Sequence, residues 1–359
     1  MVTLDLGTGG RPRRVEVRLR RFSPEGGHWF DDDGLYRGSR QGRLSWTLPP
    51  APARRRDRAG PNPFDPWNPV VPPRFQGRPL ELQRLEAALG QGHGISIVGD
   101  SRIGKSSLLR TFEKGLADGG HTVCRLDGQG PEGVSEAAFV ARVTGRPAAG
   151  GADAAADVLA AWAAAEPEGL PPVLLVDELD GLPARFDPRF FERLRHLLGR
   201  IVVVTASRRE VDQLYAELGR TSPFDTRLSF LRLGLLDEDA AQAVIGLGDG
   251  VLDPEDAGLL HRWAGRHPLY LQLLGHYLVE ARHLGESRTA ALDRFRDEAE
   301  RRLRDLWRRL DPRDQETLRA VVRGERDTAN RRLVRRGLLD AEGRPFGEVL
   351  AAWLREEAP

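Results

Sequence analysis

A glycine-rich turn between an apolar run and a helical segment constrains this chain more than any other feature. Residues 99–106 read Gly-Asp-Ser-Arg-Ile-Gly-Lys-Ser, which has the GxxxxGK[ST] spacing of a phosphate-binding loop. The apolar run 95–98 precedes it, and the helical segment 106–112 follows it. In this order, backbone N–H groups and the positive end of a helix converge on an anion. The pattern therefore predicts a strand, a phosphate loop and a helix of an α/β sheet.

The loop supplies a set of candidate nucleotide-binding residues. Gly99 and Gly104 let the backbone curl around an anion. Lys105 is expected to reach the β- and γ-phosphates, and Ser106 is expected to bind Mg²⁺ through its hydroxyl. The predicted nucleotide-binding positions are Gly99, Asp100, Ser101, Arg102, Ile103, Gly104, Lys105, Ser106 and Ser107.

Lysine is so rare in this chain that Lys105 stands out. Lysine and arginine together number 54, and only Lys105 and Lys114 are lysines. An ammonium is a compact point charge, whereas a guanidinium is a planar fork. A lysine kept among so many arginines therefore indicates a site that needs a point charge. The bias toward arginine, alanine, glycine and proline also points to a GC-rich bacterial genome.

A second apolar run ends in adjacent carboxylates. Residues 172–180 read Pro-Val-Leu-Leu-Val-Asp-Glu-Leu-Asp. Where phosphoryl groups are transferred beside such a loop, an aspartate at a strand end holds Mg²⁺, and a carboxylate can accept the proton of the attacking water. Asp177 is the predicted magnesium ligand, and Glu178 is the predicted general base. Asp180 has no predicted role and is expected at the surface.

The next apolar run, 201–205, is followed by Ala-Ser-Arg-Arg-Glu. A polar residue at the tip of the strand beside the acidic one can sense the γ-phosphate, and Arg208 is the predicted sensor, with Arg209 second. The sequence has no Asn/Thr-Lys-x-Asp motif that would read guanine, which favours adenine. The predicted ligands are therefore ATP or ADP, with Mg²⁺.

Apolar runs alternate with helical patterns over residues 74–250, the predicted phosphate-loop domain. The runs are 94–98, 121–126, 173–176, 201–205 and 228–233. Most are continuously apolar, which is typical of strands buried on both faces of a sheet. This alternation predicts a doubly wound, mainly parallel α/β sheet.

The chain before residue 74 has a different character. Residues 1–48 carry strand-like alternation and turn residues, which predict a small β-rich domain built as a β-meander. Residues 49–73 hold nine of the 25 prolines and predict an extended linker. Its apolar residues Phe64, Trp67 and Val70 indicate that it lies along a surface.

Composition excludes several other classes. Hydrophobic residues make up 40% of the chain and charged residues 30%, which is typical of a globular protein, and the formal net charge of +1 is not that of a polycation built for nucleic acid. No run approaches the roughly 18 apolar residues of a membrane span. Residues 1–10 show no secretory pattern, and the single cysteine excludes an internal disulfide framework. A cytoplasmic location is expected.

These motifs together resemble those of STAND NTPases, the signal-transduction branch of the AAA+-like P-loop ATPases. The resemblance covers about residues 70–359. Residues 75–82, Phe-Gln-Gly-Arg-Pro-Leu-Glu-Leu, are similar to the family's FxGRxxEL segment, which packs against adenine. The resemblance implies that Phe75, Gly77 and Arg78 contact the nucleotide.

The resemblance extends to the C-terminal part of the chain. Residues 265–269, Gly-Arg-His-Pro-Leu, are similar to the family's GxP segment, which implies a helical lid over 251–310 with Pro268 against the nucleotide. Residues 311–359 look like the winged-helix domain that follows the lid. The implied fold is a P-loop NTPase sheet followed by a lid and a winged helix.

The resemblance also implies a function. ATP in place of ADP would reorient the lid and the winged helix, and so control self-assembly or docking of a protein partner. Slow ATP hydrolysis through Glu178 would reset the switch. A role in bacterial signalling, stress or defence follows from the resemblance.

Two alternatives belong to other classes. Winged helices also bind DNA in initiator and transposition-regulator ATPases, and Arg331, Arg332, Arg335 and Arg336 form a basic run on one predicted helix. Acidic residues nearly balance the arginines of this end of the chain, which favours the switch over a dedicated DNA reader. The third class, a small-molecule kinase, is disfavoured by the acid pair and by the long helical C-terminal part.

Overall fold

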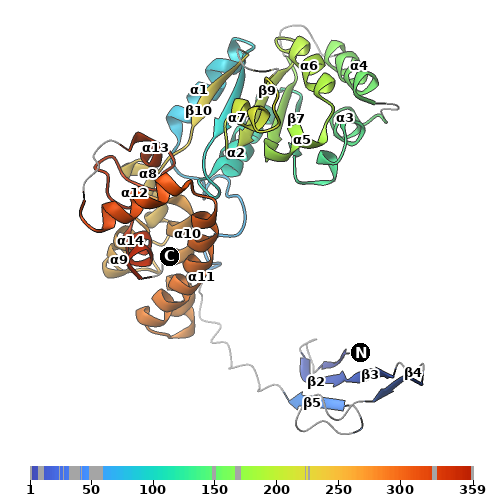
Figure 1. Cartoon of the computed structure of the whole chain (residues 1–359). Coiled ribbons are helices and arrows are strands. Elements are labelled where there is room, and N and C mark those ends of the chain that lie inside the picture. The colour runs from blue at the N-terminus through green and yellow to red at the C-terminus, as the bar shows by residue number, and fades with distance from the viewer. Residues whose placement is uncertain are drawn as a thin grey trace. The chain divides into compact units, whose positions relative to one another are not determined.

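The computed structural model describes residues 2–6, 12–23, 25–26, 28–31, 41, 43–47, 60–147, 151–165, 171–222, 224, 227–325 and 330–356. The chain forms two compact units, Met1–Gly60 and Pro61–Pro359 (Figure 1). Residues 61–73 of the predicted linker therefore belong to the larger unit. No described helix combines the length and the apolar character of a membrane span.

The smaller unit is a β-structure with two sheets. Its strands are β1 (Val2–Leu6), β2 (Pro12–Arg18), β3 (Arg20–Ser23), β4 (His28–Asp31) and β5 (Arg43–Thr47). The antiparallel order is β1-β2-β5, whereas β3 and β4 form a separate hairpin. The predicted β-rich character is confirmed, but a simple meander is wrong, because β2 and β3 do not pair. Arg18 of β2 joins the two sheets through a bidentate ion pair with Asp31 of β4 (3.0 Å for both bonds).

The larger unit is built around a five-stranded parallel sheet, as the sequence predicts. The strand order is β10-β6-β9-β8-β7. Their bounds are Leu228–Arg232 (β10), Gly94–Val98 (β6), Val202–Ser207 (β9), Val173–Asp177 (β8) and Val123–Asp127 (β7). Every neighbouring pair is parallel. The strands β6, β9 and β8 therefore end at the same edge, which is where α/β sheets bind ligands.

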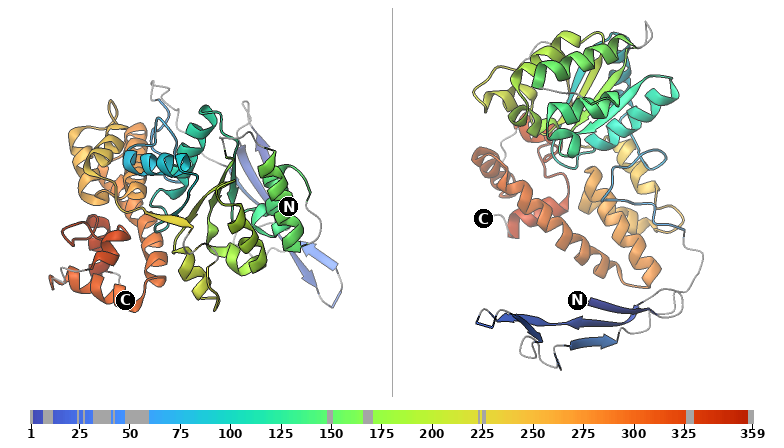
Figure 2. Two further views of the ribbon diagram at one scale, coloured as in Figure 1. Left: turned by 90° about the horizontal axis from the view of Figure 1, so that it is seen from above. Right: turned by 90° about the vertical axis from the view of Figure 1, so that its right-hand side faces the viewer.

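Helices cover both faces of this sheet (Figure 2). In β8, Val173 and Leu175 join the core on one face, whereas Leu174 and Val176 join the core on the other, so the strand is buried throughout. One face carries α1 (Pro79–Gly90) and α2 (Lys105–Asp118). The other face carries α3 (Glu136–Thr144), α4 (Gly151–Ala164) and α6 (Pro188–Leu197). Short elements are η1 (Pro131–Gly133), η2 (Leu179–Gly181), α5 (Leu182–Arg185) and α7 (Val211–Ala216).

The rest of the unit is helical. It contains α8 (Glu238–Gly246), α9 (Pro254–Ala264), α10 (Pro268–Leu284), α11 (Arg288–Arg308), α12 (Pro312–Val322), α13 (Arg331–Arg335) and α14 (Glu348–Glu356). Between α13 and α14, Leu339 and Pro345 form an antiparallel bridge around a tight turn. Two helices, a short hairpin and a final helix are the arrangement expected of a winged-helix unit.

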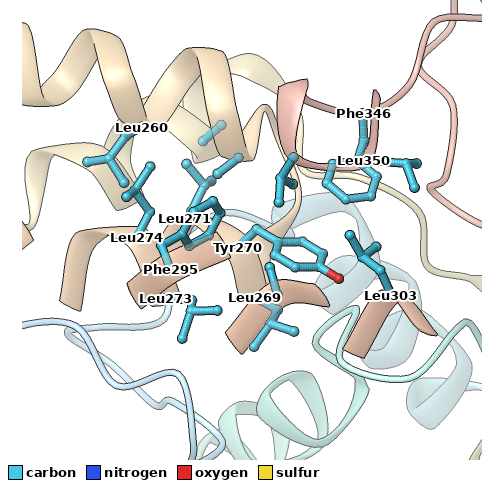
Figure 3. Packing of buried hydrophobic residues seen from close by; sticks show 14 of the residues in the cluster. Leu260, Leu269, Tyr270, Leu271, Leu273, Leu274, Phe295, Leu303, Phe346 and Leu350 are labelled. Carbon is cyan, nitrogen blue, oxygen red and sulfur yellow. The ribbon is translucent and has the colours of Figure 1, made fainter. Parts of the chain in front are cut away.

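The predicted lid and the predicted winged helix share one hydrophobic core. Figure 3 shows leucines of α10 beside Phe295 of α11 and Phe346 and Leu350 of the C-terminal segment. The rings of Tyr270 and Phe346 stack with their centroids 5.1 Å apart. Residues of α8 belong to the same core, so the helices from α8 onward form a single packed body.

Gly265, at the end of α9, lies where two backbone segments almost touch. Its φ of 54° is left-handed, and an added Cβ would overlap the carbonyl oxygen of Phe346. We expect Gly265→Ala to lower the free energy of unfolding by about 3 kcal/mol or more, because a strained backbone and a backbone clash combine. Urea denaturation checks this. Gly258→Ala in α9 is the control, since that helical glycine has open space around it and alanine there should stabilise. Equal stability of the two variants would contradict the assigned close approach.

Candidate functional site

A cavity of about 380 Å³ opens at the carboxyl edge of the sheet, between the phosphate loop and α10. Its lining comes from the phosphate loop, from Gln129, Glu178 and Arg208 after three strands of the sheet, and from two further segments, 65–70 and 268–272. The lining residues are Asp65, Pro66, Asn68, Pro69, Val70, Ser101, Arg102, Gly104, Lys105, Ser106, Ser107, Gln129, Glu178, Arg208, Pro268, Leu269 and Gln272. The structure thus brings together most of the residues that the sequence analysis selected.

Lys105 begins α2 and is almost fully buried, with 4% of its surface exposed. Its Nζ donates to the carbonyl oxygens of Gly99 (2.9 Å) and Asp100 (3.0 Å). Burial lowers the pKa of Lys105, while the nearby carboxylates of Glu178 and Asp177 act in the opposite direction. The ammonium therefore lies inside the loop, bound to two carbonyl oxygens, at the cavity where an anion would enter.

The remaining loop residues divide into those that line the cavity and those that shape the loop. Gly104 has φ 103°, a conformation that favours glycine, and it lines the cavity. A Cβ on Gly99 would lie 2.9 Å from the Leu233 carbonyl oxygen, so this glycine permits close packing. Ile103 is fully buried. Three residues of the loop, Gly99, Asp100 and Ile103, are not among the described lining residues, so they shape the loop without facing the cavity.

Glu178 follows β8 directly and lines the cavity. It has the left-handed φ of 50°, which is uncommon for a residue other than glycine and is found where function fixes a side chain. The Gln129 side-chain amide donates to its Oε2 (3.1 Å). Burial raises the pKa of Glu178, against the opposing effect of Lys105. A raised pKa suits a carboxylate that accepts a proton near neutral pH.

Two residues beside Glu178 escaped the sequence analysis. The Gly128 N–H donates to the Asp177 carbonyl oxygen (2.8 Å), and a Cβ on Gly128 would overlap the Glu178 carbonyl. Gln129 holds the Glu178 carboxylate. The stretch Asp-Gly-Gln-Gly, 127–130, directly after a predicted strand was the available indication, because it marks a turn at the same sheet edge.

Arg208 follows β9 and lines the cavity, as the sequence predicts for a sensor. Its backbone N–H donates to both carboxylate oxygens of Asp180 (3.2 and 3.0 Å). The expectation that Asp180 lies at the surface is wrong, because its side chain is only 7% exposed. Asp180 fixes the turn that carries Arg208, since β8 and β9 are neighbours in the sheet.

The predicted magnesium ligands suit a hard cation. Ser106 lines the cavity, whereas Asp177 stands outside the described lining and is buried, with 6% of its surface exposed. Asp177 Oδ1 accepts the N–H of Glu178 (3.0 Å), which leaves Oδ2 for another partner. Within the described part of the chain, no group of three or more His, Cys, Asp or Glu could hold a metal on its own. Mg²⁺ takes one or two protein oxygens together with phosphate oxygens, and Ser106 and Asp177 are the two candidate protein ligands.

The structure places only some of the residues implied by the family resemblance at the cavity. Pro268, at the start of α10, lines the cavity. Phe75 packs instead against the sheet core, and a Cβ on Gly77 would overlap Ala240. Arg78 is buried and donates to the Gly234 carbonyl oxygen (2.6 Å). In this structure, Phe75, Gly77 and Arg78 therefore brace the start of α1 outside the described lining of the cavity.

Comparison with solved structures identifies the fold. The Walker-type ATPase PABY2304 of Pyrococcus abyssi superimposes with a TM-score of 0.51 and 16% identity, over 77% of this chain and 95% of that chain. The ORC1 protein of Aeropyrum pernix in complex with DNA gives a TM-score of 0.47 and 17% identity, over 74% of this chain and 75% of that chain. No protein-family model matches the sequence, and the search of curated proteins finds no match. The chain has the α/β P-loop NTPase fold.

Proposed function

We propose that this protein is an ATP-binding and ATP-hydrolysing regulatory switch of the STAND type. Its nucleotide state controls self-assembly or the docking of a protein partner. The geometry of the phosphate loop and the acidic strand supports nucleotide binding and hydrolysis. A contact between the C-terminal helices and the phosphate loop supports the regulatory role. A place in bacterial signalling, stress or defence rests on the resemblance of the sequence motifs.

The hydrolytic step uses side chains already in position. Lys105 and the amides of the loop bind the phosphates and neutralise their charge. The Glu178 carboxylate, oriented by Gln129, accepts the proton of the attacking water. Arg208 reads the γ-phosphate from the end of β9. Ser106 and Asp177 would hold Mg²⁺, which supplies charge stabilisation to the phosphate oxygens when bound.

The observation that carries the regulatory role is the placement of Arg336, directly after α13. Its Nε and one terminal nitrogen donate to the two carboxylate oxygens of Asp100 in the phosphate loop (2.7 and 3.0 Å). The other terminal nitrogen donates to Asp314 of α12 (3.0 Å). The next residue, Gly337, packs against the Ile103 side chain, since a Cβ there would lie 3.1 Å from it. Arg336 and Gly337, in the C-terminal helical part of the chain, therefore contact the phosphate loop directly.

This contact couples the loop to the helical body. A bidentate guanidinium–carboxylate pair is geometrically demanding, so a small shift of the loop weakens it. Asp314 is only 3% exposed in its side chain and also pairs with Arg332 (3.2 Å), which keeps Arg336 aligned. We infer that exchange of ADP for ATP moves Asp100 relative to Arg336 and releases the helical body.

Removal of the contact is therefore expected to release the switch. Arg336→Gln should shift the ADP-bound protein toward the assembly state or mass that the wild type shows with a slowly hydrolysed ATP analogue. Light scattering during gel filtration measures the mass with each nucleotide. Arg335→Gln is the matched control, because Arg335 is the exposed neighbour on α13. A wild-type mass and shape that do not change between ADP and the ATP analogue would contradict the switch.

The ion pairs of the basic run also affect the alternative that the C-terminal helices bind DNA. Of the four arginines in the basic run, Arg336 pairs with Asp100 and Asp314 and is partly buried, whereas Arg332 pairs with Asp314 but keeps 57% of its side chain exposed. Arg336 is therefore less available to phosphates of a nucleic acid than the sequence alone indicates. No described contact favours DNA binding over the switch, so DNA binding is not proposed here.

A further inference from the structure

Part of the proline-rich segment crosses the candidate nucleotide cavity. We call residues 61–71 the strap. At one end, the Val70 N–H donates to the Ser107 hydroxyl oxygen of the phosphate-loop helix (3.1 Å). In its middle, the Asp65 N–H donates to Gln272 Oε1 of α10 (2.9 Å). At the other end, the Asn62 amide donates to the His276 carbonyl oxygen (3.0 Å). The strap therefore joins the phosphate loop to the lid helix.

The strap is fixed by packing as well as by hydrogen bonds. Phe64 is 2% exposed and fills the space beside Gly275, where an added Cβ would lie 2.6 Å from its ring. The ring of Trp67 lies edge-on to the His276 imidazole, with centroids 4.5 Å apart. A glycine on α10 thus admits the aromatic side chain that anchors the strap. The wall that the strap forms is preorganised rather than loose.

Two apolar walls face the same cavity. The strap contributes Pro66, Pro69 and Val70, and the first turn of α10 contributes Pro268 and Leu269. Glu178, Arg208 and Lys105 also line this cavity, so it has an apolar part and a charged part. A planar heteroaromatic ring attached to a polyphosphate matches that division, because the ring buries apolar surface and the phosphates meet the charges.

Gln272 is the polar residue between these apolar walls. It is 6% exposed and lines the cavity. Its Oε1 accepts the Asp65 N–H, which fixes the orientation of the amide, because a backbone N–H needs an acceptor. The Nε2 group is then a directed donor, and it donates to no residue in the part of the chain that the structure describes. A donor of fixed orientation on a residue that lines the cavity can serve an acceptor on a ligand.

We propose that the strap and Gln272 form the base-recognition site, and that Gln272 is a base-binding residue that donates from Nε2 to a ring nitrogen of adenine. Adenine has unprotonated ring nitrogens that can accept this hydrogen bond. A carboxylate at position 272 has no proton to donate and would repel them. This inference rests on the proposed nucleotide-binding function. It places the base against residues 65–70, one segment before the 75–78 stretch that the family resemblance implied.

Gln272→Glu tests the donor directly. Glutamate keeps an oxygen for the Asp65 N–H but replaces the donor by an acceptor. Competition binding at neutral pH should show the affinity for ATP and ADP falling about 10-fold or more, since one buried hydrogen bond is lost and an opposed pair is created. The affinity for inorganic tripolyphosphate, which has no base, should stay within about twofold.

Two further variants complete the test. Gln272→Met removes the donor without adding charge, and it should weaken ATP binding while leaving tripolyphosphate binding intact. Gln213→Glu adds the same charge on the exposed side of α7 and should change neither affinity. Equal ATP affinity in the wild type and both Gln272 variants would overturn the inference, as would an equal loss for ATP and tripolyphosphate. A wild-type protein that binds neither ligand would instead overturn the proposed function.

Discussion

Lys105→Ala should weaken ATP binding by about 100-fold or more, because the charge-assisted contact between an almost fully buried ammonium and the phosphates is removed. The ammonium is held by the carbonyl oxygens of Gly99 and Asp100, so it is preorganised at the point where a phosphate would arrive. Alanine would leave the loop backbone in place but without its positive charge. Isothermal titration calorimetry with ATP and Mg²⁺ measures the loss.

The chain offers an unusually close control for this experiment. Lys114 is the only other lysine in the sequence, and it lies exposed on the same helix, α2. Lys114→Ala should leave ATP affinity unchanged. Lys105→Arg should also fail to bind normally, because a planar guanidinium does not fit where a point charge lies between two carbonyl oxygens. Undiminished binding by Lys105→Ala would show that the loop does not hold a polyphosphate.

Glu178→Gln should separate binding from hydrolysis. We expect phosphate release to fall by about 100- to 1,000-fold, because the amide cannot accept the proton of the attacking water. ATP affinity should stay within about threefold. The Gln129 side chain can still donate to the amide oxygen at position 178, so the local geometry is retained. Single-turnover phosphate release and calorimetry on the same sample measure the two quantities.

Glu192→Gln on α6 is the matched control, since that glutamate is exposed and carries the same charge. It should hydrolyse ATP at the wild-type rate. Unchanged phosphate release by Glu178→Gln would exclude this carboxylate as the general base. A parallel loss of binding and hydrolysis would instead assign it a role in holding the nucleotide.

The parallel sheet could be predicted because its strands are continuous apolar runs flanked by helical patterns. The positions of the phosphate loop and of Glu178 at one edge of the sheet could be predicted because their residues are close in sequence and follow strands. The contact between Arg336 and Asp100 could not, since its partners are 236 residues apart and nothing local marks either one. The proposed role of Gln272 could not be predicted for a related reason. Gln272 lies within an apolar helix, and the orientation of its amide depends on a hydrogen bond from Asp65, a residue distant in sequence.

Proline content was informative but incomplete. It excluded helix from the 49–73 stretch, and Phe64, Trp67 and Val70 indicated that this stretch lies along a surface, but not which surface. The structure shows that residues between 65 and 70 line part of the cavity, because Phe64 and Asp65 find specific partners on α10. Such partners depend on tertiary packing, which periodicity and composition do not encode.

The hydrophobic core shared by the helices from α8 onward limits how the protein can change shape. Since α10, α11 and α14 pack together, and Gly265 leaves no gap against Phe346, we expect these elements to move as one rigid body. The sheet connects to that body through residues 233–237, where Arg78 donates to the Gly234 and Leu235 carbonyl oxygens. Rotation of the whole body is therefore expected to centre on this short junction, and Arg78 would set its pivot.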